Sequence, residues 1–325
     1  MVQDPMEKGR HRMIDRRSLL LTLSLAPLLG TRAMAQTAPV SIAATTGMIA
    51  DVARRLSGGE VTALMGAGMD PHGYRPTRSD ILALSRADVI LWHGLHLEAQ
   101  FDDVMADLAR QRTVVALADS LPRADLLSDP AYPDRPDPHV WFDPKLWSAV
   151  VRNAADVLAT AGFDTAAPAE ALLADIASLD TYAQQVLATV PDSSRILVTA
   201  HDAFAYFGRA YGWQVEGIQG ISTESEAGLA RITELVDLLV ARKIGAVFVE
   251  SSVSDRAIRA LIEGVAAQGH TITIGGELYS DAMGPDGTYE GTYIGMIDHN
   301  ITTIARALGG DAPERGMVGK LNAGT

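Results

Sequence analysis

Cysteine is absent from all 325 residues of the chain. This absence excludes a disulfide framework and a thiolate metal ligand. It also leaves no cysteine to carry a lipid at a processing site. We therefore expect a protein without a lipid anchor.

Basic residues are scarce relative to acidic ones. The chain has 27 Lys and Arg against 40 Asp and Glu, a formal net charge of −13 at pH 7. Nucleic-acid binding depends on neutralising phosphates with Lys and Arg, so we expect no nucleic-acid partner. The acidic character suits a cationic ligand, although it also serves solubility alone.

The N-terminal apolar run is too short to span a membrane. It extends from Ser18 to Gly30 and contains Pro27, whereas a spanning helix needs about 20 residues. Basic residues precede it and the small-x-small sequence Ala33–Ala35 follows it, as in a secretory signal peptide. We predict a cleaved signal over residues 1–35 and a soluble periplasmic product. The pair Arg16–Arg17 leaves the twin-arginine and the general export routes both open.

Short β-rich runs alternate with amphipathic helices after the signal. The expected strands of the first part cover 40–45, 61–65, 88–94 and 114–119. A helix opens at Thr77, where Asp80 three residues later makes a variant of the capping box. Strands that alternate with helices predict βαβ units on a mostly parallel sheet.

The same alternation restarts later in the chain. Pro144 is placed to begin a helix that ends near Gly162, and a second apolar helical stripe runs from Pro168 to Pro191. The strands expected next cover 195–200, 213–218, 246–250 and 270–275; the helices begin at Ala203 and cover about 225–242, 254–268 and 291–308. We interpret the second long helix as a spacer between lobes, with a long core helix as the alternative.

The fold class predicted is therefore α/β, with two similar lobes of mostly parallel sheet joined by a long rigid helix. The domain boundaries expected are an N-terminal α/β lobe over 36–165, a linker helix over 166–191 and a C-terminal α/β lobe over 192–325. In such folds the ligand loops follow the carboxyl ends of the strands, so a site is expected in the cleft between the lobes.

Four polar residues stand in such loops, two from each expected lobe: His72, His139, His201 and Asp281. Three imidazoles and a carboxylate are ligands for Zn²⁺, and a bidentate carboxylate raises the coordination number towards what Mn²⁺ accepts. Two of the histidines occur in the repeated tripeptide Asp-Pro-His. Its proline restricts the backbone on both sides and would hold the imidazole rigidly.

Other polar residues have weaker claims. Asp70 and Asp137, which begin the two tripeptides, are either acceptors for the imidazole rings or simple turn formers, and we favour the turn. The remaining histidines of the mature chain, His93, His96, His270 and His299, are expected to be packing or capping groups. The sequence leaves open whether Glu250 and Glu277 approach the site.

Seven motifs in order resemble one known family. They are "DPHGYRPTRSD", "GLHLEAQF", "DPHVWFDP", "TAHDAFAYFGRAYG", "FVESSVSDRAI", "GGELYSDAMG" and "GTYIGMIDHNITTIARALGG". Together they are similar to the TroA-like periplasmic metal-binding proteins of ABC importers, over about residues 40–310. The resemblance implies one metal ion held by His72, His139, His201 and Asp281. It also implies a membrane permease and a cytoplasmic ATPase as partners, and we expect a monomer.

The resemblance leaves the metal open. Manganese and iron carriers of the family have glutamate at the third ligand position, where this chain has His201. Dedicated zinc carriers often have a histidine-rich loop before the second motif, and the corresponding stretch "SLPRADLLSDPAYPDRP" has none. The chain is similar to an intermediate group associated with both metals. Imidazole ligands favour Zn²⁺ over Mn²⁺, but metal supply can reverse that order.

Two other functions compete with metal import. A metal-dependent hydrolase needs an open coordination position, and the chain has no His-Glu-x-x-His, Gly-x-Ser-x-Gly or phosphate-loop motif, so we expect no enzyme. An adhesin with a structural metal is the second alternative, because some proteins of the family are described in that way.

Overall fold

The first four strands form one parallel sheet. The computed structural model describes residues 40–128, 134–224 and 228–322, so the expected signal peptide lies outside it. The strands are β1 (Ile42–Ala44), β2 (Val61–Ala63), β3 (Val89–Trp92) and β4 (Thr113–Ala116), in the order β2-β1-β3-β4. Every pair is parallel, as the sequence pattern predicts.

Alternate residues of these strands enter two apolar clusters. Ile42, Ala44 and Leu91 belong to the large core, whereas Ala43 and Ile90 pack with Phe101 in a smaller cluster on the other face. This is the two-residue period of a strand, and both faces of the sheet are covered.

The helices of this part begin at residues suited to capping them. In α1 (Gly47–Ser57) the side chain of Thr46 accepts from the backbone of Ile49. In α2 (Arg78–Arg86) Thr77 and Asp80 form the complete capping box, which confirms that prediction. The short α3 (Asp102–Leu108) was not predicted from the sequence.

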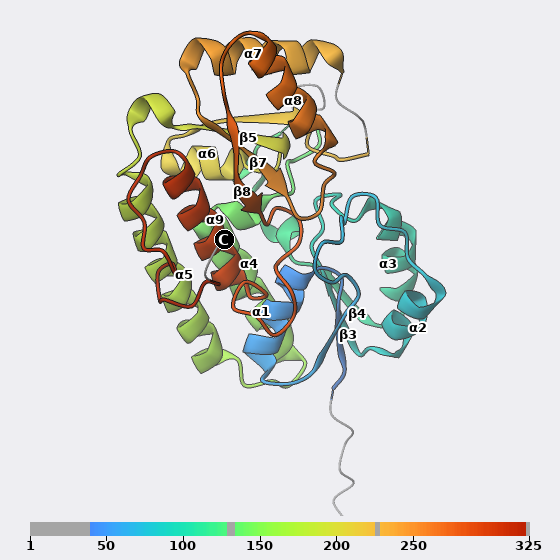
Figure 1. The fold of residues 1–325 in the computed structure, drawn as a ribbon. Coiled ribbons are helices and arrows are strands. Elements are labelled where there is room, and N and C mark those ends of the chain that lie inside the picture. The colour runs from blue at the N-terminus through green and yellow to red at the C-terminus, as the bar shows by residue number, and fades with distance from the viewer. Residues whose placement is uncertain (1–39, 129–133, 225–227, 323–325) are drawn as a thin grey trace, which may run out of the picture. The chain divides into compact units, whose positions relative to one another are not determined.

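The strands of the second part form two pairs. Strand β5 (Ile196–His201) pairs with β6 (Gln214–Gln219), and β7 (Ala246–Glu250) pairs with β8 (Thr273–Leu278), all in parallel. Strands therefore pair in parallel in both parts, but the first part has one four-stranded sheet and the second has two pairs of strands. Strand β5 lies beside β7, as Figure 1 shows.

Several boundaries differ from the sequence prediction. Strand β8 begins three residues later than expected, because its register with β7 starts where Thr273 pairs with Ala246. His201 is the last residue of β5 rather than the residue after it. The helix expected from Ala203 is α6 (Ala205–Tyr211). The other helices are α7 (Leu229–Arg242), α8 (Arg256–Ala267) and α9 (Tyr293–Ala307).

Two long helices connect the parts. Helix α4 (Pro144–Thr160) has Pro144 in its first turn, as predicted, with Asp143 as its cap. Helix α5 (Ala166–Leu187) begins two residues before Pro168, which the first turn tolerates because no helical partner is needed there. It packs against α1, α4 and α9 (Figure 1). It thus contacts helices from both parts of the chain through its buried stripe.

No helix among the described residues is both long and apolar enough to cross a membrane.

Candidate metal centre

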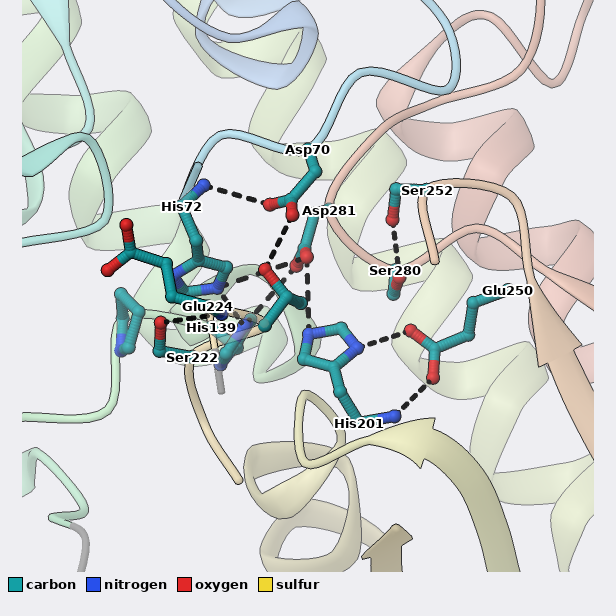
Figure 2. Close-up of polar contacts among 12 residues, drawn as sticks. Asp70, His72, His139, His201, Ser222, Glu224, Glu250, Ser252, Ser280 and Asp281 are labelled. Atoms are coloured by element: carbon teal, nitrogen blue, oxygen red, sulfur yellow. Dashed lines mark hydrogen bonds and ion pairs between the residues drawn. The ribbon is translucent and has the colours of Figure 1, made fainter. Parts of the chain in front are cut away.

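Four side chains from separate segments converge on one point. His72 lies between β2 and α2, His139 precedes α4, His201 ends β5, and Asp281 follows β8. One ligand atom of each lies within 4.8 Å of the others. Figure 2 shows the three imidazoles and the carboxylate facing one another. The structure therefore brings together all four residues predicted from the sequence.

The spacing of these atoms fits a single metal ion. The Nε2 atoms of His72 and His139 are 3.3 Å apart. The Nε2 atoms of His139 and His201 lie 3.3 and 3.2 Å from the two oxygens of Asp281, and that of His72 lies 3.9 Å from one of them. Tetrahedral ligands with bonds of about 2.0–2.1 Å are about 3.3 Å apart.

The four residues are withdrawn from solvent. His139 and His201 are 0% exposed, Asp281 is 2% and His72 is 6%. Both Asp281 oxygens and Nε2 of His201 have no hydrogen-bond partner among the described residues. Buried polar atoms without partners are costly. A divalent cation at their centre would satisfy all of them.

The two Asp-Pro-His tripeptides form the same local turn but hold their imidazoles differently. In each, an oxygen of the aspartate accepts the backbone N–H of the histidine at 2.9 Å. Asp137 also accepts from Nδ1 of the His139 ring at 2.7 Å. Our preference for a simple turn was therefore wrong at Asp137. For Asp70 the contacts to His72 are those of the turn.

Glu250 holds the His201 imidazole. One of its oxygens lies 2.5 Å from Nδ1 of His201, and the other accepts the backbone N–H of the same residue at 2.9 Å. Glu250 is the last residue of β7 and His201 is the last of β5, so adjacent strand ends bring them together. Glu277 has an exposed side chain and takes no such part.

These carboxylates determine the tautomer of two ligands. A carboxylate at Nδ1 keeps the proton on that nitrogen and leaves the lone pair of Nε2 for a metal. The sequence carries a local signal for Asp137, which is two residues from its histidine. It carries no signal for Glu250, which lies 49 residues away.

Charged neighbours shift the pKa values of the clustered residues and favour the ionised form of Asp281. Burial opposes charge at His139, but Asp137 and Asp281 outweigh it and raise the pKa of His139 to about 9. Burial likewise opposes charge at His201, yet Glu250 and Asp281 hold its pKa well above the usual value. Burial disfavours ionised Asp281, but the neighbouring imidazoles keep its pKa well below the usual value. Burial lowers the pKa of His72 to about 3.

Three of the remaining histidines contact backbone carbonyls, in structural roles as expected. Nε2 of His93 lies 2.7 Å from the carbonyl of Pro138, and that of His270 lies 2.8 Å from the carbonyl of Ile244. His299 makes the same kind of contact with Glu277 at 2.8 Å. His96 is largely exposed, with a positive φ of 61° and Asp102 at 3.6 Å. None of these four belongs to the metal cluster found among the described residues.

Comparison with known proteins decides the family. The family model described as zinc-uptake complex component A, periplasmic, matches residues 42–307. The chain belongs to this family. It is a family of solute-binding proteins rather than enzymes, and the chain is accordingly a metal-capturing component of an uptake system.

Relatives within the family are similar along nearly their whole length. The manganese-binding lipoprotein MntA of Bacillus subtilis is 47% identical over 281 residues, covering 83% of this chain and 90% of the relative. The zinc-binding protein TroA of Treponema pallidum is 44% identical over 273 residues, covering 82% and 88%. The solved structure of the periplasmic zinc-binding protein TroA superposes with a TM-score of 0.80 at 43% identity, covering 82% of this chain and 98% of that one.

Proposed function

We propose that His72, His139, His201 and Asp281 bind one Zn²⁺ or Mn²⁺ ion, which the protein delivers to the permease of an ABC importer. The observation that carries this proposal is the cluster itself: four buried ligand atoms lie within 4.8 Å, and those of His201 and Asp281 have no hydrogen-bond partner among the described residues. The metal is cargo, because four protein ligands leave little room for the water that a catalytic zinc needs.

The choice between the two metals rests on chemistry that supports each. Three imidazoles favour Zn²⁺. Both oxygens of Asp281 face the ligand space, and bidentate coordination would suit Mn²⁺. The relatives point in both directions, since MntA is named for manganese and TroA for zinc.

Metal content tests the proposal directly. The protein is recovered from its own periplasm, its metals are counted by mass spectrometry, and Zn²⁺ then competes with Mn²⁺ on stripped protein. One zinc ion that excess Mn²⁺ cannot displace would make zinc the cargo. Native manganese, with tight zinc binding only in vitro, would make manganese the cargo. Absence of a stoichiometric metal from the native protein, and of binding to the stripped one, would overturn the proposal.

A histidine variant tests the ligand set. His139→Ala should abolish stoichiometric binding. The matched control is His96→Asn, which removes an exposed imidazole and keeps a residue that tolerates positive φ. Unchanged binding by His139→Ala would contradict the assignment.

We propose further that the chain is exported and released after Ala35, by the twin-arginine or the general route. The chain contains no cysteine, whereas the relative MntA is named a lipoprotein. The mass of the mature protein tests cleavage after Ala35. Size-exclusion chromatography tests the expectation that the protein is a monomer. The names of the relatives reported above refer to metals, so they lend the adhesion alternative no support.

The lobe boundaries of 36–165, 166–191 and 192–325 are likewise part of this proposal. A stiff α5 between the lobes would permit only small movements on metal release. Scattering profiles of metal-free and metal-loaded protein check this expectation; a change of several ångströms in the radius of gyration would contradict it.

A further inference from the structure

The three histidines of the cluster are held unequally. His139 and His201 each have a carboxylate at Nδ1, supplied by Asp137 and Glu250. The corresponding residue at His72 is Asp70, and its first oxygen accepts only the backbone N–H of His72 (Figure 2). Carboxylates therefore hold the rings of His139 and His201, whereas Asp70 does not contact the ring of His72.

The second oxygen of Asp70 has a different partner. It accepts a hydrogen bond of 2.5 Å from the hydroxyl of Thr223. Thr223 lies in the segment 220–224 that follows β6, which we call the Thr223 loop, whereas Asp70 and His72 lie in the segment 64–77 between β2 and α2, the His72 loop. One aspartate thus ties a ligand-bearing loop to a loop 153 residues away.

The His72 loop also borders the solvent side of the cluster. His72 is the most exposed of the four ligands at 6%. It lines a cavity of about 530 Å³ together with Leu95, Pro138, Ile221 and Glu224. Asp70 and Thr223 line a second cavity of about 580 Å³, and Glu224 borders both. The bond between Asp70 and Thr223 therefore lines a cavity that shares Glu224 with the cavity lined by His72.

We propose that Thr223 is a positioning residue that acts through Asp70 to hold His72 over the bound metal, and that this bond sets the rate of metal release. The inference rests on the proposed function of the cluster. His139 and His201 stay in place through their contacts with Asp137 and Glu250 when the bond opens. His72 then moves away with its loop and exposes the ion to solvent.

Chelator-chase kinetics test this role. Protein loaded with Zn²⁺ alone is mixed with an excess of a chromogenic zinc chelator in a stopped-flow instrument. Thr223→Val removes the hydroxyl at nearly constant volume, and we expect release about tenfold faster, as for loss of one hydrogen bond to a charged acceptor. Thr223→Ser keeps the hydroxyl and should restore slow release. In an Asp70→Ala background, Thr223→Val should have no further effect.

The control is Thr181→Val, which removes an exposed hydroxyl bonded to the backbone of its own helix. Equal release rates for Thr223→Val and the wild type would overturn the proposal. A second outcome would also overturn it: Thr223→Val releases metal faster, and its metal-free form has a lower thermal midpoint than metal-free Thr181→Val. That pattern indicates general destabilisation. A wild type that binds no zinc would overturn the proposed function itself, and this outcome is distinct from unchanged release by a loaded variant.

Discussion

Glu250 contacts His201 twice, with one oxygen 2.5 Å from the ring Nδ1 and the other 2.9 Å from the backbone nitrogen. This pair fixes both the position of the residue and the orientation of its ring. The cluster thus depends on carboxylates outside the four proposed metal ligands, and their contribution is measurable.

Glu250→Gln should weaken metal binding by about 10–100-fold, the usual cost of losing an orienting carboxylate behind a metal ligand. The amide has no charge to hold the proton on Nδ1, so the tautomer with a free Nε2 is less favoured. Competition titration with a chelator of known affinity measures the change. Glu277→Gln alters an exposed side chain on β8 and serves as the control. Affinity within about twofold of the wild type for Glu250→Gln would refute this role.

Metal binding should release protons near neutral pH. The pKa of His139 is about 9 in the metal-free site, so its imidazole is protonated at pH 7 and the metal must displace that proton. Affinity is therefore expected to fall as the pH falls. Calorimetry in buffers of different ionisation enthalpy counts the protons, and a count of zero at pH 7 would contradict the expectation.

The same group makes the stability of the metal-free protein depend on pH. Its folded pKa of about 9 lies above the ordinary value of 6.5. The stabilisation is fully present below about pH 6.5 and is lost as the pH rises through about 9. Thermal unfolding should show this contribution in the metal-free protein, and it should be absent from His139→Ala. Identical pH profiles for the two proteins would show that His139 makes no such contribution.

Asp281→Asn should reduce the affinity for both metals by more than about 100-fold, beyond the loss expected for an orienting group. The loss should be larger for Mn²⁺, because the amide offers one oxygen where the carboxylate presents two towards the ligand space. Parallel titrations with each metal give the ratio. Asp286→Asn, an exposed change nearby, controls for loss of charge. An equal loss for both metals would argue against bidentate coordination.

Tyr206→Phe should lower the free energy of unfolding by about 1–3 kcal/mol. The buried hydroxyl donates to the carbonyl of Asp137 at 2.9 Å and accepts from the backbone N–H of Leu127 at 3.0 Å. Removing it leaves the carbonyl of Asp137 and the N–H of Leu127 without this partner. Denaturant unfolding measures the loss. Tyr211→Phe, which removes a longer 3.2 Å bond to Asp180, should cost less; the reverse order would contradict the explanation.

Local sequence patterns were enough to predict several helix starts, the fold class and the four clustered residues. The capping box of Thr77 and Asp80 and the helix start at Pro144 involve residues a few positions apart, so local backbone preferences decide them. The alternation of strands and helices gave the parallel α/β class, and polar residues at strand ends predicted the four clustered side chains. The start of β8 was displaced, since its pairing with β7 decides it.

Only the tertiary structure decided which acidic residues hold those side chains. Asp70 and Asp137 occupy identical tripeptides, yet Asp137 contacts the ring of its histidine and Asp70 contacts Thr223. Glu250 and Glu277 both lie on strands of the second part, and only the Glu250 side chain contacts an imidazole of the cluster. A carboxylate accepts from whichever donor the folded chain places within about 3 Å. For Asp70 and Glu250 that choice depends on contacts between residues far apart in the sequence, which no local pattern encodes.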